Sequence, residues 1–377
     1  MSSTSQTAIY VSTIIDSHNY GTVLQAVATR DALSPYGRPI FIDYCRPHWT
    51  TKGWIMSYMG NGNRSVPERL ARLAANAPVR HKSSKLFRSF VERELELCSS
   101  APYLSQGEGL DSDAVYCVGS DQTWNIECNH GIDPVYFLAN VPEGYRKISF
   151  SASFGRPSLS SEESELTKPL LSQFDAISVR ESSSVSILEG MGLSGTALKD
   201  PVLLCRPELW HELAARVPAS NENYVLVYML NENPEMCAFA RKLAKREGIR
   251  ARIVTFNPLK RAPEGLEGVC LPKPEEWVAL FRDASYVVTD SFHGTCFSLL
   301  FEHPMIVFDP PKFSVRLKDV LADFGLADRR VADGSDPMRI AEEPVDWVSV
   351  SSKKGEFSSE AKAFLDGVFG VSARAGV

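Results

Sequence analysis

The sequence AIYVSTIIDSHNYGTVLQAVATRDAL, residues 8–33, decides the fold class of this chain. Residues 8–15 are rich in β-branched and aromatic side chains and predict a strand, whereas residues 22–33 have apolar side chains at helical spacing. The polar residues between them predict a turn. A second apolar run follows at residues 40–44, so the order is strand, loop, helix, strand, which predicts a parallel sheet.

The same alternation continues along the chain and falls into two groups. Further strands are predicted at residues 114–119, 147–155 and 176–181, and then at 223–230, 249–256, 286–290 and 304–308. We therefore predict an α/β protein with two Rossmann-like, doubly wound domains, at residues 1–196 and 197–350.

The composition fits this class of protein. A chain of 377 residues with 44% hydrophobic and 23% charged residues favours two globular domains over one. The net charge of −6 argues against general nucleic-acid binding, which needs a basic footprint. The sequence contains no apolar run of about 18 residues, so no transmembrane helix is predicted. Residues 1–7 lack the features of a secretory signal. Eight cysteines without a CxxC pair are typical of reduced thiols, so we expect a cytoplasmic protein.

Residues 47–105 interrupt the alternation and are expected to form a helical insertion in the first domain, with helices at residues 66–77 and 85–98. Residues 64–88 include seven bases and one acid, Glu68. Two interpretations stay open. The charge forms a solvated helix face, or it contacts an anionic lipid-linked acceptor or the inner face of a membrane.

Ligands of open α/β sheets bind beyond the carboxyl ends of the strands, so the polar loops there hold the candidate site residues. The first loop offers Asn19, Tyr20 and Gly21, and the glycine permits close approach of a ligand to the backbone. Ordinary helix capping by Asp16 or Asn19 explains the same residues.

The second loop, residues 119–125, combines an acid, two amides and a tryptophan behind a buried strand. Such groups can bind sugar hydroxyls, and Trp124 can stack on a sugar ring. A polar turn with a core tryptophan is the alternative. The candidates in this loop are Ser120, Asp121, Gln122, Trp124 and Asn125.

Cations at strand ends are candidates for binding an anionic substrate. Arg180 can hold a carboxylate or phosphate through its forked guanidinium, although an ion pair with Glu181 is equally consistent with the sequence. Lys312 and Arg316 can add charge to the same cleft, but exposed bases are usually only solvated.

The most informative loop is TDSFHGT, residues 289–295, which links an apolar strand to a helix. The N-terminus of that helix can bind an anion, and His293 can bind phosphate or transfer a proton. A structural histidine is the alternative. The candidates in this loop are Asp290, Ser291, His293, Gly294 and Thr295.

The absence of several well-known motifs limits which cofactors and metals can be predicted. The sequence has no GxxxxGK[ST] phosphate loop, no GxGxxG after a strand and no HExxH, so neither a catalytic metal nor a cofactor is predicted. The remaining histidines are scattered along the sequence and are interpreted as structural or surface residues. They include His48, His81, His130, His211 and His303.

Several segments occur in one order along the chain: NYGTVLQA, VGSDQTWN, SFSASFG, SVRE, KDPVLL, TDSFHGTCFSLLFEHPMIVF and SVRLKDVLADFGLADR. This order resembles the polysaccharide pyruvyl transferase family from about residue 9 to about residue 329. The segments GSDQTWN and DSFHGT are the most specific. The departures, Ser182 to Ser184 and Cys296, remove no proposed ligand and leave the acceptor open.

The resemblance implies a glycosyltransferase-B-like architecture, in which two Rossmann-like domains face a cleft and residues 351–377 pack back on the N-terminal domain. It implies phosphoenolpyruvate as the donor substrate, with no cofactor. The acceptor would be a sugar or lipid-linked oligosaccharide of a bacterial cell-wall or exopolysaccharide precursor. The product would be a pyruvate ketal, with release of phosphate.

The resemblance also implies roles for the candidate residues. His293 would bind the donor phosphate or act as general acid, Asp121 would be the base for an acceptor hydroxyl, and Asp290 would orient His293. The donor-binding set is Arg180, Ser291, His293, Gly294, Thr295, Lys312 and Arg316. The acceptor-binding set is Asn19, Tyr20, Gly21, Ser120, Gln122, Trp124 and Asn125.

Two rival functions stay open because a fold does not dictate an activity. One is a nucleotide-sugar-dependent glycosyltransferase of the same architecture, which would bind the diphosphate with the loop at residues 289–295. The other is a non-catalytic glycan-binding protein.

Overall fold

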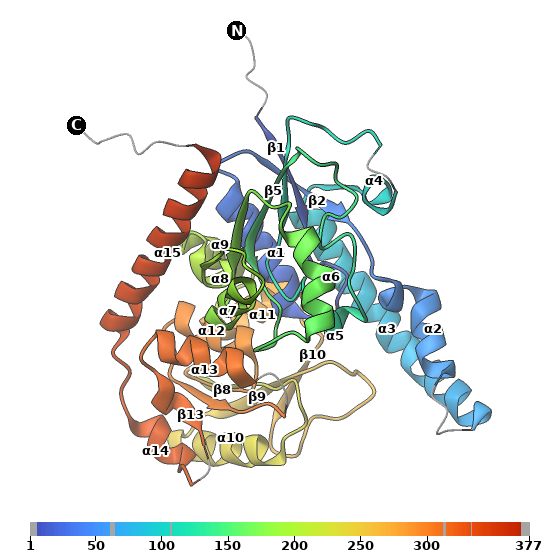
Figure 1. Ribbon diagram of the computed structural model, residues 1–377. Coiled ribbons are helices and arrows are strands. Elements are labelled where there is room, and N and C mark those ends of the chain that lie inside the picture. The colour runs from blue at the N-terminus through green and yellow to red at the C-terminus, as the bar shows by residue number, and fades with distance from the viewer. Residues whose placement is uncertain (1–5, 61–64, 106–107, 312–313, 333, 371–377) are drawn as a thin grey trace. The chain divides into compact units, whose positions relative to one another are not determined.

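A computed structural model describes residues 6–60, 65–105, 108–311, 314–332 and 334–370 (Figure 1). The chain divides into two compact units. Unit 1 comprises Met1–Ala75, Arg88–Arg206 and Glu356–Val377, and unit 2 comprises Asn76–Phe87 and Pro207–Gly355.

Unit 1 is built on a seven-stranded sheet in the order β3-β2-β1-β4-β5-β6-β7, and each neighbouring pair of strands is parallel. Most residues of its central strands β1, β4 and β5 are buried, as expected when helices cover both faces of a parallel sheet. The strands are β1 (Ala8–Ser12), β2 (Arg38–Asp43), β3 (Leu97–Ser99), β4 (Val115–Val118), β5 (Arg146–Ala152), β6 (Ala176–Val179) and β7 (Thr196–Ala197).

The helices of unit 1 follow the carboxyl ends of these strands. The first helix follows β1 in the chain, and most of its residues are buried. The segments that lie wholly in this unit are α1 (Tyr20–Leu33), η1 (Pro47–Trp49), α2 (Thr51–Met59), α4 (Ala101–Leu104), α5 (Ile126–Asn129), α6 (Ser161–Leu171), α7 (Ser182–Gly190) and α8 (Pro201–Leu204).

The predicted insertion differs in detail from the structure. The two helices expected at residues 66–77 and 85–98 are one helix, α3 (Val66–Glu94), with Pro78 inside it. A proline removes only one backbone donor, and a helix of this length keeps its hydrogen bonds on both sides of that position. The chain leaves the helix at Leu95 and enters β3, because residues from Leu97 pair with β2.

Unit 2 repeats the same topology in a six-stranded parallel sheet with the order β10-β9-β8-β11-β12-β13. Each sheet is parallel, and in each the strand order reverses at its centre, as in a doubly wound fold. These two sheets confirm the predicted α/β class with two Rossmann-like domains. The strands are β8 (Tyr224–Tyr228), β9 (Arg250–Thr255), β10 (Glu267–Cys270), β11 (Tyr286–Thr289), β12 (Met305–Phe308) and β13 (Arg330–Val331).

The helices of unit 2 include the amphipathic helix α10 and the mostly buried helix α12. In α10 the buried positions recur every three to four residues, which places one apolar face on the sheet. The segments are α9 (Glu208–Ala214), α10 (Pro234–Glu247), α11 (Pro274–Arg282), α12 (Phe292–Leu300), α13 (Ser314–Asp323), η2 (Ala327–Arg329) and α14 (Pro337–Glu342).

The last helix, α15 (Trp347–Phe369), begins in unit 2 and ends in unit 1. Within unit 1 the hydroxyl of Tyr36 donates a 2.7 Å hydrogen bond to the carboxylate of Asp366. The ring of Tyr36 also stacks on Phe369, with 5.0 Å between ring centroids. The C-terminal residues of the helix therefore pack against the turn that follows α1.

Candidate functional site

The strand order reverses between β1 and β4 of unit 1, and polar side chains gather at that point. The amide of Gln25 donates to the hydroxyl of Thr13 (3.0 Å), which donates to the carbonyl of Ser120 (2.8 Å). The hydroxyl of Thr22 donates a 3.1 Å hydrogen bond to the carboxylate of Asp121. The loops after β1 and β4 are thus tied together at the carboxyl edge of the sheet, where open α/β sheets bind their ligands.

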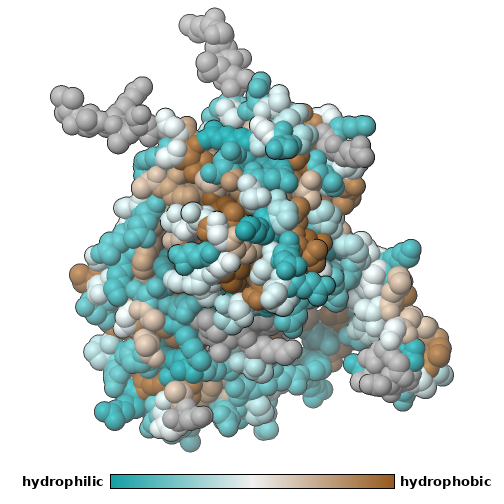
Figure 2. Space-filling model, viewed as in Figure 1, coloured by the Kyte–Doolittle hydropathy of each residue, from teal (hydrophilic) through white to brown (hydrophobic). Residues whose placement is uncertain are grey.

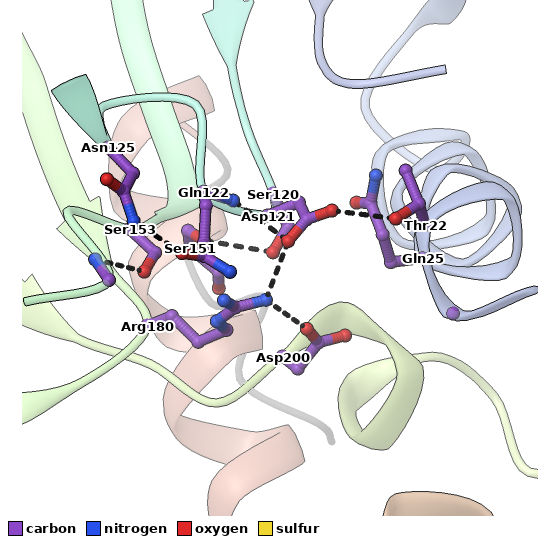
Figure 3. Close-up of polar contacts among 12 residues, drawn as sticks. Thr22, Gln25, Ser120, Asp121, Gln122, Asn125, Ser151, Ser153, Arg180 and Asp200 are labelled. Carbon is purple, nitrogen blue, oxygen red and sulfur yellow. Dashed lines mark hydrogen bonds and ion pairs between the residues drawn. The ribbon is translucent and has the colours of Figure 1, made fainter. Parts of the chain in front are cut away.

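Asp121 lies at the centre of this arrangement (Figure 3). Its backbone is in the left-handed region, with φ of 70°, and its side chain is buried. The carboxylate accepts hydrogen bonds from Thr22 and from the backbone N–H of Gln122, and it lies 3.5 Å from the guanidinium of Arg180. An ionised carboxylate held at a switch point is suited to accept a proton from a hydroxyl group.

Arg180 follows β6 and is surrounded by acids. Its Nη1 donates to Asp200 at 2.8 Å, and its guanidinium also lies 3.5 Å from Asp121 and 3.6 Å from Glu181. Burial works against the charge, but these carboxylates outweigh it and raise the pKa of Arg180. One cation among three carboxylates leaves a net negative cluster, which does not favour a second anion beside the guanidinium.

The prediction for Trp124 is wrong, because this side chain belongs to the core. It is fully buried, and its indole N–H donates a 2.9 Å hydrogen bond to the carbonyl of Tyr136. The rings of Phe137, Phe154 and Phe174 surround it at centroid distances of 5.3 to 6.0 Å. No face of the indole is left for a sugar ring.

The other residues of this loop are engaged with the protein. Ser120 is buried and donates to the carbonyl of Ser151 at 2.9 Å. The amide of Asn125 donates to the side chain of Gln122, and its oxygen caps α5. A Cβ atom at Gly155 would overlap the side-chain amides of Gln122 and Asn125, so these two amides pack directly against the backbone of Gly155. Of this set, only Gln122 is partly exposed.

In the first loop, which contains Asn19, Tyr20 and Gly21, the structure shows ordinary helix capping. The side chain of Asn19 caps α1 by accepting a 2.9 Å hydrogen bond from the N–H of Gly21, and Tyr20 and Gly21 are buried. Asp16 does not cap the helix. Its carboxylate pairs with the buried guanidinium of Arg46 at 2.6 Å.

Sequence reasoning missed Arg46 and its neighbours. Arg46 follows β2 at the same sheet edge, and its guanidinium carbon lies 5.9 Å from the ring centroid of Trp49. The ring of His18 meets Trp49 edge-on at 5.3 Å. The signal was available, because CRPHW directly follows a predicted strand. The predicted insertion begins at Pro47 and so includes His48 and Trp49, whereas Arg46 lies just before it and was given no role.

His48 and His130 are surface residues, as predicted, but they are neighbours in space although they lie far apart in the sequence. Their rings lie 4.4 Å apart, and His48 also contacts Trp49 at 6.4 Å. Burial, with Arg46 and His130 nearby, lowers the pKa of His48, so this imidazole is neutral near pH 7. The cluster of His18, His48, His130 and Trp49 is therefore a half-buried aromatic surface beside the switch point of unit 1.

A second polar site occupies the switch point of unit 2, between β8 and β11. Asp290 is buried and accepts hydrogen bonds from the backbone N–H groups of Leu230 (2.7 Å) and Asn231 (2.9 Å) and from the Asn231 amide (2.9 Å). The hydroxyl of Thr289 donates to the carbonyl of Tyr228 at 2.7 Å. Asp290 thus orients the loop that follows β8.

His293 is the second residue of α12, whose N-cap is Ser291. The histidine is mostly buried, with 8% of its surface exposed. A Cβ atom at Gly294 would lie 2.3 Å from the hydroxyl of Thr289, so glycine is required for close packing of helix and strand. Thr295 is fully buried and donates to the carbonyl of Ser291. Of the loop's candidates, His293 is the one whose type is not explained by packing or capping.

Of the two predicted donor ligands downstream of this loop, Arg316 and Lys312, the structure describes only Arg316. The guanidinium carbon of Arg316 lies 5.6 Å from the ring centroid of Phe292, the first residue of α12. This contact places a cation beside the helix N-terminus that carries His293. Lys312 lies outside the described residues.

Unit 2 also contains a cavity of about 510 Å³ beyond the carboxyl ends of β8 and β9. Its lining includes Phe256 and the bases Arg241, Lys260 and Arg261. Leu230, which donates to Asp290, contributes to the same lining. The cavity is of a size that holds a small organic ligand.

Two Rossmann-like domains with polar side chains at their switch points define a class of two-domain α/β proteins, in which ligands bind beyond the carboxyl edges of the sheets. The chain belongs to the polysaccharide pyruvyl transferase family, because the sequence model of that family matches residues 19–311. Membership implies a transferase with phosphoenolpyruvate as donor and a sugar as acceptor. No curated protein matches the sequence significantly.

Solved structures with a similar course of the chain are sugar-nucleotide epimerases and glycosyltransferases. A UDP-GlcNAc 2-epimerase from Neisseria meningitidis is 12% identical with a TM-score of 0.48, covering 94% of each chain. A glycosyltransferase from Streptomyces nogalater is 12% identical with a TM-score of 0.43, covering 99% of this chain and all of the other. An O-GlcNAc transferase mutant from Thermobaculum terrenum is 12% identical with a TM-score of 0.43, and the match covers 97% of this chain but only 64% of that one. The fold class rests on the two sheets rather than on these likenesses.

Two features are absent from the described residues. No helix among them is long and apolar enough to cross a membrane. Within the same residues, no group of three or more His, Cys, Asp or Glu side chains is arranged to hold a metal ion.

Proposed function

We propose that this protein transfers the pyruvyl group of phosphoenolpyruvate to two hydroxyls of a sugar, forming a pyruvate ketal and releasing phosphate. The observation that carries the proposal is His293 in the first turn of α12, at the switch point of unit 2, in a chain of this family. A helix N-terminus attracts phosphate and carboxylate groups, and an imidazole can donate a proton.

The donor side would use α12. Phosphoenolpyruvate carries a phosphate and a carboxylate, and Arg316 adds a cation beside the N-terminus of the helix. A proton added to C3 of the enol makes C2 electrophilic. One acceptor hydroxyl bonds to C2 and loses its proton, and a second hydroxyl displaces phosphate from C2 and closes the ketal. His293 would supply the proton to C3 or bind the phosphate.

The acceptor side would use Asp121. Its carboxylate lies 3.5 Å from the guanidinium of Arg180 and accepts a hydrogen bond from Thr22, so it can take the proton of an attacking hydroxyl. We assign Arg180 as the positioning residue of this carboxylate rather than as the main donor ligand. Its three acidic neighbours would repel the phosphate and carboxylate of the donor. Trp49 replaces Trp124 as the aromatic residue proposed to stack on the sugar.

Phosphate release tests the proposal directly. The purified protein is mixed with phosphoenolpyruvate and bacterial cell-wall glycan fractions, and free phosphate and ketal formation are followed. We expect release that depends on a glycan and falls strongly in His293→Gln. The matched control is His211→Gln, an exposed histidine of the same unit. Binding of glycan without phosphate release from phosphoenolpyruvate would favour a non-catalytic role instead.

One observation favours a second candidate, a nucleotide-sugar-dependent glycosyltransferase. The cavity of unit 2 is lined by Phe256, which can stack on a base, and by Arg241, Lys260 and Arg261, which can face phosphates. Thermal stabilisation by a nucleoside diphosphate sugar, with no response to phosphoenolpyruvate, would support this function over pyruvyl transfer.

A further inference from the structure

Helix α2 and the first turns of α3 expose apolar side chains together. Four of the nine most exposed large apolar side chains of the described residues lie between positions 55 and 70. They are Ile55 (39% exposed), Met56 (61%), Val66 (52%) and Leu70 (51%). Helix α2 buries none of its nine residues, although five of them are aromatic or aliphatic. Figure 2 shows apolar residues on this part of the surface among polar ones.

Contacts within this segment hold it together, and we call it the α2–α3 tip, residues 51–60 and 65–75. The guanidinium of Arg69 donates a 2.5 Å hydrogen bond to the carbonyl of Met59, which joins the start of α3 to the end of α2. Trp54 and Tyr58 lie one turn apart on α2, with ring centroids 5.2 Å apart. Aromatic residues beside exposed aliphatic ones are typical of segments that lie in the interface of a bilayer.

The net charge of the tip is positive. Its residues include the bases Lys52, Arg69 and Arg72 and a single acid, Glu68. The carboxylate of Glu68 accepts a 3.0 Å hydrogen bond from the N–H of Ser65, so it belongs to the capping box of α3. A basic segment with exposed apolar side chains suits an anionic lipid surface. Two copies of the same tip would repel each other.

The tip is closely joined to the aromatic surface beside the candidate acceptor site. Only Thr50 separates Trp49 from α2, and its hydroxyl both donates to the carbonyl of Pro47 (2.7 Å) and caps the helix at Gly53 (3.1 Å). A Cβ atom at Gly53 would lie 2.0 Å from the Pro47 carbonyl oxygen, so η1 and α2 are in close contact. The direction of α2 is thereby fixed relative to Trp49.

We propose that the α2–α3 tip docks on an anionic membrane surface, with Ile55, Met56, Val66 and Leu70 entering the interface and Lys52 and Arg72 facing the lipid phosphates. Docking itself does not depend on the pyruvyl transfer reaction. A consequence that does rest on the proposed function is that the acceptor sugar is attached to a lipid, since docking would bring Trp49 near the membrane.

Vesicle flotation of the full chain tests the docking without donor or acceptor, so its result is separate from that of the reaction. We expect the protein to float with vesicles of equal parts phosphatidylglycerol and phosphatidylcholine, more weakly at high salt, and far less with phosphatidylcholine alone. The Ile55→Ser and Met56→Ser double variant should lower the partition by about tenfold or more, because the apolar area that enters the lipid is lost.

Two further variants make the result decisive. Leu259→Ser removes an apolar side chain of unit 2 that is 69% exposed and should leave flotation unchanged. Lys52→Gln with Arg72→Gln should weaken flotation only with the anionic vesicles. The proposal is overturned if the wild-type protein does not float with anionic vesicles, or if the serine double variant floats equally well. A wild-type dimer in sedimentation that the serine variant abolishes would assign the tip to a second copy instead.

Discussion

The guanidinium of Arg180 donates a 2.8 Å hydrogen bond to Asp200, and both side chains are almost completely buried. The same guanidinium lies 3.5 Å from Asp121, the proposed base. Asp200 also accepts from the N–H of Val202 and so caps α8. The position of Asp121 is therefore linked through one cation to a rigid helix start in unit 1, and loss of Arg180 would affect folding as well as activity.

Replacing Arg180 should be strongly destabilising. In Arg180→Gln the buried carboxylates of Asp200 and Asp121 lose their cation, which costs about 3–5 kcal/mol for a broken buried pair. Urea unfolding followed by circular dichroism would measure this loss. Adding Asp200→Asn to Arg180→Gln should recover part of the stability, since one unpaired charge is removed. A destabilisation below about 0.5 kcal/mol in the single variant, the range of ordinary surface substitutions, would contradict the buried network.

Asp121→Asn should separate chemistry from folding. The amide keeps the shape of the carboxylate and can still accept from Thr22, but it cannot take a proton. We expect kcat to fall about 10²- to 10⁴-fold, as for the loss of a general base. The affinity for phosphoenolpyruvate, measured by thermal shift, should change little. An unchanged kcat would remove Asp121 from the reaction.

The two tryptophans of unit 1 should behave in opposite ways. Trp124→Ala empties a fully buried site among three phenylalanines and should cost about 3–5 kcal/mol of stability. Trp49→Ala should leave the unfolding midpoint nearly unchanged and raise the KM for the acceptor about tenfold, while the KM for phosphoenolpyruvate stays constant. Equal effects of Trp49→Ala on both KM values would argue against sugar stacking.

The strands that sequence patterns predicted are the inner strands of both sheets. Most of them are rich in β-branched, aliphatic or aromatic residues, which mark a largely buried strand even where Ser, Lys or Arg interrupts the run, as in β5 and β9. The four strands that were missed, β3, β7, β10 and β13, are the four edge strands. They have two to four residues with few buried positions, so their pairing depends on the neighbouring strand and not on a local pattern.

The same reasoning explains which parts of the site were predictable. The loops of Asp121 and His293 could be found because they follow inner strands, and the topology places them at the switch points. The surroundings of Arg180 could not, because Asp200 follows β7, a two-residue strand without a pattern. The burial of Trp124 depends on Tyr136 and Phe137, whose packing no local motif reveals.

His303 should make the stability of unit 2 depend on pH. Its Nε2 lies 3.1 Å from the carbonyl oxygen of Arg282, which can only accept, so the neutral ring is assigned a proton on this nitrogen. Burial lowers the pKa of His303 below 6.5 and outweighs the opposing effects of that carbonyl, Asp283 and Glu302. The unfolded chain therefore binds more protons than the folded one between the folded pKa and about 6.5, and stability falls as the pH drops through this window.

The variant His303→Gln isolates this contribution. Glutamine can keep a hydrogen bond to the Arg282 carbonyl but does not titrate, so the variant should lose less stability than the wild-type protein between about pH 7.5 and about pH 5. Urea midpoints at both pH values give the two slopes. The difference in slope, and not the stability at one pH, is the informative quantity, because the substitution also changes packing. His48 of unit 1, whose pKa is also lowered, adds a slope of the same sign to the unfolding of the whole chain in both proteins, so the pH dependence measured for the whole chain should shrink without vanishing. Equal slopes would show that the protonation of His303 does not oppose folding.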